Sequence, residues 1–123
     1  MTDGLPSIRP YRGGEYLLSD SGNASRDAIV VVGGNYFAST VLGQVTATGR
    51  MTALNPSASD GSEIAAGILY GPTAAAGAPV RATATVRNAE VNGRLLGWPA
   101  GITPAQQATA IAQLAALGII VRS

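Results

Sequence analysis

The chain has 123 residues, enough for about one domain with its own core, and it contains neither cysteine nor histidine. Without these side chains it has no disulfides, no thiolate chemistry and no cysteine-based zinc site, and it lacks the group best suited to proton transfer near neutral pH. Its eight positive side chains, all arginines, are balanced by seven carboxylates for a formal net charge of +1, so its charge gives no drive toward nucleic acid. We therefore expect no direct nucleic-acid partner.

The surface of the folded chain is expected to carry few charges. Charged residues make up 12% of the sequence, about half the ordinary share for a soluble domain. A neutral surface on a small domain favours association, so the composition is typical of an assembled protein. No apolar run approaches the roughly 18 residues that a membrane span needs, and the N-terminus has no basic region followed by an apolar stretch. We expect no membrane partner.

Residues 1–27 differ in character from the rest of the chain. They mix prolines, glycines and charges of both signs with widely spaced apolar groups, so alone they cannot bury enough surface to offset their ordering entropy. We interpret them as an extended N-terminal arm whose anchors are buried on a partner; the alternative is a frayed tail. The candidate partner-contacting residues are the apolar anchors and the two arginines among them: Leu5, Ile8, Arg9, Tyr11, Arg12, Tyr16, Leu17 and Leu18.

From residue 28 onward the pattern predicts β-structure. Short branched or alternating apolar runs are separated by glycine, proline and polar turn residues. Thr48 and Gly49 form a tight connection, so the runs on either side of them are expected to pair as a hairpin. The strands we predict are residues 28–32, 40–47, 50–54, 64–70 and 80–86.

The strand over residues 80–86 alternates most clearly. One set of side chains is expected to face the core: Val80, Ala82, Ala84 and Val86. The other set is expected to face solvent or a partner: Arg81, Thr83, Thr85 and Arg87. The two arginines of that set either bind a surface that bears carboxylates or simply keep this face of the sheet soluble.

One helix is predicted, over residues 104–117. Thr103 is a good N-cap, Pro104 fits the first helical turn, and Gln106 sits where it closes a capping box. Its apolar stripe is expected to comprise Ala108, Ile111, Leu114 and Leu117. Gly118 ends the helix in a left-handed conformation, and residues 119–121 are expected to return to a sheet as a terminal strand.

The remaining reactive groups do not suggest catalysis. Asp60 and Glu63 lie in a turn-rich loop, where exposed carboxylates are poor general acids at neutral pH. We predict no catalytic residue, no cofactor and no metal site. The only tryptophan, Trp98, is followed by Pro99 just before the helix, and we interpret the pair as a packing or subunit contact. The alternative is a sugar-stacking platform that also uses Tyr36 or Tyr70.

The order and spacing of several segments resemble the lambda-type head decoration proteins of tailed phages. The resemblance covers roughly residues 41–122. The segments that carry it are Val41-Leu42-Gly43, Asn55-Pro56, Ser59-Asp60-Gly61-Ser62, Ala66-Gly67-Ile68-Leu69-Tyr70, Arg87-Asn88-Ala89-Glu90-Val91-Asn92, Trp98-Pro99-Ala100-Gly101-Ile102 and Gly118-Ile119-Ile120-Val121.

This resemblance implies a homotrimer seated on the outer surface of the phage capsid. It would sit at local three-fold positions of the expanded shell and cement neighbouring major capsid subunits against internal DNA pressure, without an active site. The expected fold class is α+β, mainly β: a compact mixed-sheet, barrel-like domain over residues 28–123, with one C-terminal helix and a terminal strand, preceded by the arm of residues 1–27. The other function compatible with the residues is a carbohydrate-binding or adhesive module on a phage tail or spike.

Overall fold

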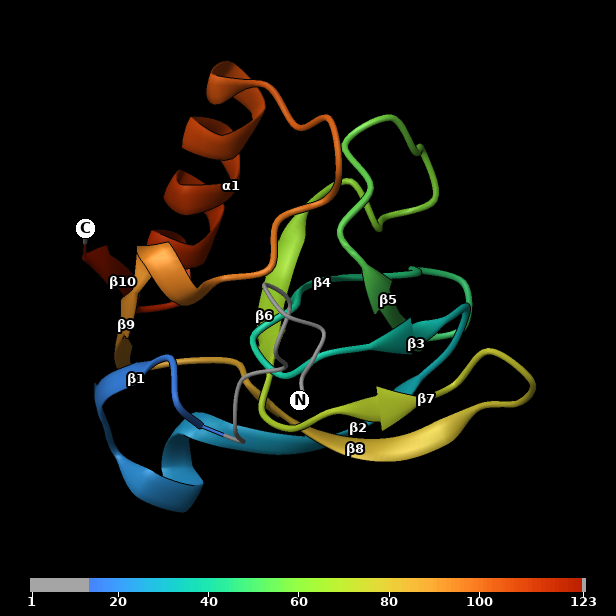
Figure 1. The fold of residues 1–123 in the computed structure, drawn as a ribbon, viewed down its shortest axis with the longest axis horizontal. Helices are drawn as coiled ribbons and strands as arrows, with labels where there is room; N and C mark the ends of the chain where they lie inside the picture. Colours follow the sequence, from blue (N-terminus) through green and yellow to red (C-terminus); the bar gives the residue numbers. More distant parts are fainter. Residues whose placement is uncertain (1–13, 123) are drawn as a thin grey trace, which may run out of the picture.

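The computed structural model describes residues 14–122, which form a mainly β structure with one α-helix near the C-terminal end (Figure 1). The predicted fold class is confirmed. In chain order the elements are β1 (Leu17–Asp20), η1 (Gly22–Ser25), β2 (Arg26–Val31), β3 (Asn35–Tyr36), β4 (Val41–Gln44), β5 (Met51–Ala53), β6 (Ala65–Leu69), β7 (Thr73–Ala74), β8 (Val80–Thr85), β9 (Ala89–Asn92), η2 (Gly93–Leu95), α1 (Pro104–Ala116) and β10 (Ile119–Arg122).

Five strands close into a barrel in the order β2-β5-β4-β6-β8. The predicted hairpin is present, because β4 pairs antiparallel with β5 from Leu42 opposite Ala53 to Gln44 opposite Met51. β2 pairs antiparallel with β8 along its whole length. On its other side β2 meets β5 through a single parallel pair, Val31 with Met51, so this pair closes the barrel.

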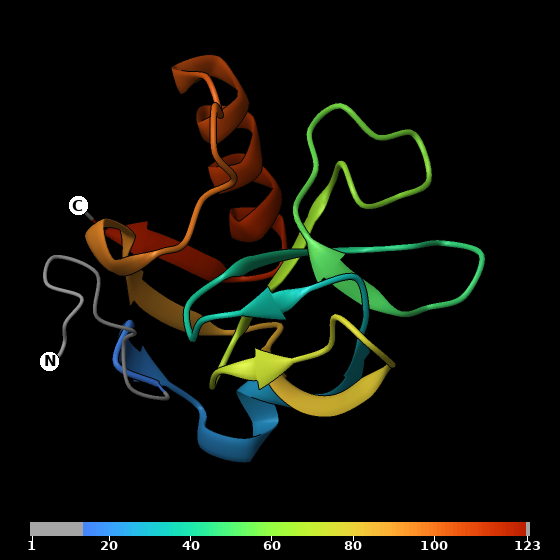
Figure 2. The ribbon, with the colours of Figure 1, turned by 45° about the vertical axis from the view of Figure 1, so that its right-hand side comes forward.

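A second sheet, β1-β9-β10, lies beside the barrel with α1 packed against it, and Figures 1 and 2 show this sheet and the helix at one end of the molecule. β10 runs parallel to β9, so the expected terminal strand is present. β1 runs antiparallel to β9 on the other edge. Part of the segment that we expected to be an arm is therefore paired in sheets: residues 17–20 in β1 and residues 26–27 at the start of β2.

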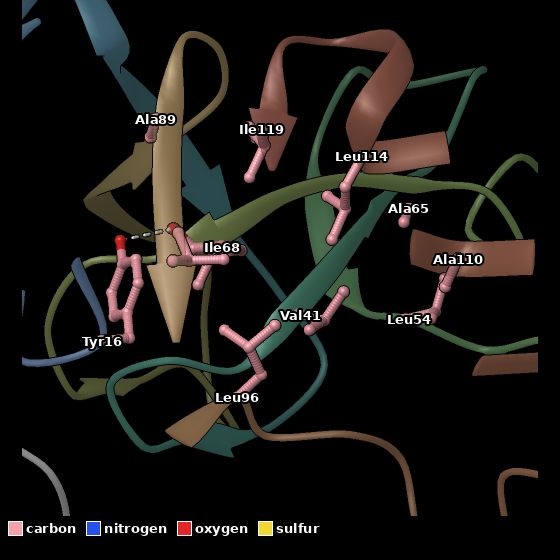
Figure 3. Close-up of a cluster of buried hydrophobic side chains, with 11 residues drawn as sticks. Tyr16, Val41, Leu54, Ala65, Ile68, Ala89, Leu96, Ala110, Leu114 and Ile119 are labelled. Carbon is pink, nitrogen blue, oxygen red and sulfur yellow. Dashed lines mark hydrogen bonds between the residues drawn. The ribbon is translucent and has the colours of Figure 1, made fainter. Parts of the chain in front are cut away.

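The buried side chains form two clusters. The larger one joins the helix, the second sheet and the barrel, and Figure 3 shows Leu114 of α1 beside Ile119, with Ala110 of the same helix near Leu54. The smaller one fills the barrel around Val31 and Leu69. The barrel strands thus contribute to both clusters, and the segment before β1 contributes Tyr16 to the larger one.

Two expectations about burial are wrong. Thr85 was expected on the face of its strand directed to solvent or a partner. It is fully buried instead, and its hydroxyl is in contact with the Tyr16 side chain. The helix buries Ala110 and Leu114, four residues apart, whereas Ala108 is exposed and Leu117 is 38% exposed. The ends of the helix are as predicted: Thr103 and Gln106 form a capping box, and Gly118 has φ +83°.

Candidate functional site at the root of the N-terminal segment

The structure separates the candidate partner-contacting residues into two groups. The first group lies outside the described residues: Leu5, Ile8, Arg9, Tyr11 and Arg12. The second group, Tyr16, Leu17 and Leu18, lies where the N-terminal segment enters the fold. Tyr16 is fully buried and Leu17 packs against the larger cluster, whereas the Leu18 side chain is 55% exposed. Of these three, only Leu18 offers most of its side chain to a partner.

Tyr16 fixes the entry of the chain by hydrogen bonds to the barrel. Its hydroxyl lies 2.6 Å from Thr85 Oγ1 and donates to the carbonyl oxygen of Ile68 at 3.3 Å (Figure 3). Burial raises the pKa of Tyr16 to about 12, so the hydroxyl keeps its proton at any ordinary pH. A buried hydroxyl with two partners is costly to separate from them, so Tyr16 holds this end of the segment on the barrel.

Gly14 fixes the backbone at the start of the described chain. Its N–H donates to the carbonyl oxygen of Tyr70 at 2.8 Å, and its carbonyl accepts from the N–H of Leu17 at 3.0 Å. Its φ of +74° favours glycine, and a Cβ at this position would lie 2.8 to 2.9 Å from the Tyr70 ring. Any other residue would therefore strain the backbone and collide with the ring.

Arg26 connects Tyr70 to β1. Its guanidinium carbon lies 4.6 Å from the centre of the Tyr70 ring, within the range of a cation–π contact. Its Nη2 is 2.8 Å from Asp20 Oδ2, and both side chains are only partly accessible. Its Nε is buried without a hydrogen-bond partner among the described residues. We name the set Gly14, Tyr16, Arg26, Tyr70 and Thr85 the arm root.

The short turn between β1 and β2 is also fixed by side chains. Ser25, fully buried, accepts from the N–H of Ser21 at 2.8 Å and donates to the carbonyl oxygen of Asn88 at 2.8 Å. Arg87 Nη2 pairs with Asp27 Oδ2 at 2.8 Å, and Arg87 Nη1 donates to the carbonyl oxygen of Ala24. The sequence did not predict the arm root. Its contacts join residues that are far apart in the chain, so they leave no local pattern.

The aromatic residues considered as a sugar platform lie in different surroundings. Trp98 is half-buried against the larger cluster, while Tyr36 packs on the barrel cluster and its hydroxyl donates to the carbonyl oxygen of Val32 at 3.1 Å. Tyr70, also half-buried, belongs to the arm root. Pro99 is half-buried and accepts from the N–H of Ile102 at 3.2 Å. Each aromatic ring thus packs against a different part of the fold.

The loop carboxylates stabilise a turn. Asp60 Oδ1 accepts from the N–H and the hydroxyl of Ser62, and these hydrogen bonds lower the pKa of Asp60. Glu63 Oε1 accepts from the N–H of Gly61 at 2.8 Å. Within residues 14–122 no three histidine, cysteine or acidic side chains are grouped so that they could hold a metal ion. No helix in this part of the chain is long and apolar enough to cross a membrane.

These features define a small β-barrel protein whose candidate site fixes the start of the described chain on the barrel. A family model described as bacteriophage lambda head decoration protein D matches residues 8–119. The chain belongs to this family, which consists of structural proteins of the phage head. Its role is therefore capsid decoration in the virion of a tailed phage. No curated protein matches the chain.

Proposed function

We propose that the protein binds the outer surface of an expanded phage head as a homotrimer at local three-fold positions. There it contacts the major capsid protein through its N-terminal segment and stabilises the shell against internal DNA pressure. The observation that supports this proposal is that the arm root fixes the start of the described chain on the barrel. Gly14 and Tyr16 hold the start of the described chain on the barrel at Tyr70 and Thr85. The described chain thus begins at a fixed point on the barrel.

Attachment of each N-terminal segment at a fixed point on the barrel would strengthen multivalent binding to the capsid. Three N-terminal segments on one trimer would act together, since linked binding segments raise each other's effective concentration to the order of millimolar. Avidity of this kind exceeds the affinity of one segment by about 10² to 10⁴. The candidate contacts in this segment remain Leu5, Ile8, Arg9, Tyr11 and Arg12, with Leu18 at its base. Trp98 and Pro99 remain candidates for packing or subunit contact.

The test is to delete residues 1–13 and leave the arm root intact. We expect the truncated protein to keep its fold and its trimer mass, measured by light scattering, and to lose at least about 100-fold in apparent affinity for expanded heads. A control in which a Gly/Ser segment of equal length replaces residues 1–13 separates the role of the anchors from that of chain length. Full occupancy of expanded heads by the truncated protein would contradict the proposal.

A further inference from the structure

The barrel has an unpaired strand edge beside a groove. β5 begins where β2 ends, so the only residue pair between them is Val31 with Met51. Among the described residues no strand lies on that side of β2 between Arg26 and Val30. A groove of about 970 Å³ opens there, lined by β2, the β4–β5 hairpin, the start of β6 and the end of α1. The wall of the barrel is therefore incomplete at this place.

The register shows which backbone groups face the groove. Val86 N–H donates to the Ser25 carbonyl, so in the alternating antiparallel ladder the odd-numbered residues of β2 bond to β8. At the other end Val32 N–H donates to Met51 O at 2.8 Å, so the even-numbered residues point the opposite way. The N–H and C=O groups of Ala28 and the N–H of Val30 are thus directed toward the groove, whereas the Val30 carbonyl is engaged in the parallel pair of Val31 with Met51. An extended segment could hydrogen-bond to the groups that face the groove as an added strand.

The side chains of the groove combine an apolar floor with positive charge. Ile64 is 50% exposed and Leu117 is 38% exposed, and both line the groove. Arg50 and Arg81 also line it, and no carboxylate of the described residues lies within ion-pair distance of either. The groove's one acidic residue, Asp27, is already paired with Arg87. An uncovered apolar surface flanked by two unpaired arginines is complementary to an apolar segment that carries carboxylates.

We propose that this groove, the β2 groove, is a second docking surface, which binds an extended segment of the capsid protein. The segment adds as a strand to the edge at Ala28 and Val30, places apolar side chains on Ile64 and Leu117, and directs carboxylates to Arg50 and Arg81. The identity of the partner rests on the proposed function. The expected chemistry of the segment follows from the groove itself. The open strand edge requires an extended segment, the exposed apolar side chains require apolar residues, and the arginines require carboxylates.

Two groove variants test the proposal without disturbing the N-terminal segment. Ala28→Pro removes one N–H from the open edge and leaves the ladder to β8 intact, because that N–H does not point to β8. Arg50→Glu combined with Arg81→Glu reverses the charge of the groove. Arg94→Glu is the matched control, since Arg94 is exposed on η2 and does not line the groove.

We expect both groove variants to keep the circular dichroism, melting temperature and mass of the unmodified protein. Both should bind expanded, undecorated heads at least about tenfold more weakly, and the arginine variant should show a smaller salt dependence of binding. The control should decorate normally. If the groove variants decorate normally while deletion of residues 1–13 abolishes binding, the groove proposal fails and the proposed function stands. If they lose oligomer mass, the groove is a contact between copies of this chain, and the proposal also fails.

Amide hydrogen exchange gives a second readout that does not depend on any variant. In the unmodified free protein the Ala28 and Val30 amides should exchange faster than those of Ile29 and Val31, which face β8. On decorated heads the same two amides should become protected. Protection already present in the free protein would overturn the proposal, because the edge would then be covered without the capsid. Unmodified protein that fails to bind expanded heads would overturn the proposed function together with this partner.

Discussion

The N–H of Gly14 donates to the carbonyl oxygen of Tyr70 at 2.8 Å, and the Tyr70 ring occupies the space that a side chain at position 14 would need. Gly14→Ala should therefore destabilise the fold by about 1 to 2 kcal/mol from the left-handed backbone alone, with the collision adding to this. Chemical denaturation measures the effect. Gly77→Ala is the control, because a Cβ at position 77 meets nothing within 4 Å. Equal stability of the two variants would contradict the role given to Gly14.

The Tyr16 hydroxyl should contribute to stability through its buried partners. Tyr16→Phe leaves Thr85 Oγ1 and the Ile68 carbonyl without this contact, and we expect a loss of about 1 to 3 kcal/mol in the free energy of unfolding. Thr85→Val should cost a similar amount. The double variant should cost less than the sum of the two, because both single changes break the same hydrogen bond. Additive losses in the double-mutant cycle would mean that the two hydroxyls act independently.

The raised pKa of Tyr16 makes stability depend on alkaline pH. Since burial raises the pKa from 10.0 to about 12, the folded state holds this proton more tightly than the unfolded state. The contribution is complete below pH 10 and is lost as the pH rises from about 10 to 12, with a slope of up to about 1.4 kcal/mol per pH unit. Tyr16→Phe should show a shallower loss of stability over this window. Identical pH profiles for the two proteins would contradict this assignment.

The buried face of α1 can be tested by truncating two leucines in turn. Leu114 is fully buried, so Leu114→Ala should cost about 2 to 5 kcal/mol through a cavity in the larger cluster. Leu117 is 38% exposed and lines the β2 groove, so Leu117→Ala should cost much less in the free protein. Thermal unfolding of both variants measures the difference. Equal losses for the two variants would contradict the observed face and favour the stripe through both Leu114 and Leu117 that we expected from the sequence.

Local patterns predicted the elements whose stability is local. Thr103, Gln106 and Gly118 mark the ends of the helix by chemistry that acts within a few residues, and the capping box is present. The hairpin around Thr48 and Gly49 was predicted for the same reason. Strands β3 and β7, of two residues each, carry too few side chains to show a period and were missed.

The burial errors arose from contacts between distant parts of the chain. Thr85 follows the alternation of an exposed position, yet it is buried and lies in contact with the hydroxyl of Tyr16, 69 residues earlier in the chain. The helix shows the same limitation, since alanines and leucines leave several apolar faces possible and the sheet selects the one through Ala110 and Leu114. The arm root and the β2 groove depend wholly on such contacts, so no stretch of sequence indicates them.

The hydrogen bonds of Tyr16 also bear on the order of folding. Its partners Ile68 and Thr85 lie 52 and 69 residues later in the chain, and β1 pairs with β9, which is later still. During synthesis the N-terminal segment emerges first, yet it has nothing to bind until most of the chain has followed. The arm root is therefore expected to be among the last parts to form, so the start of the described chain is fixed on the barrel only when folding is nearly complete.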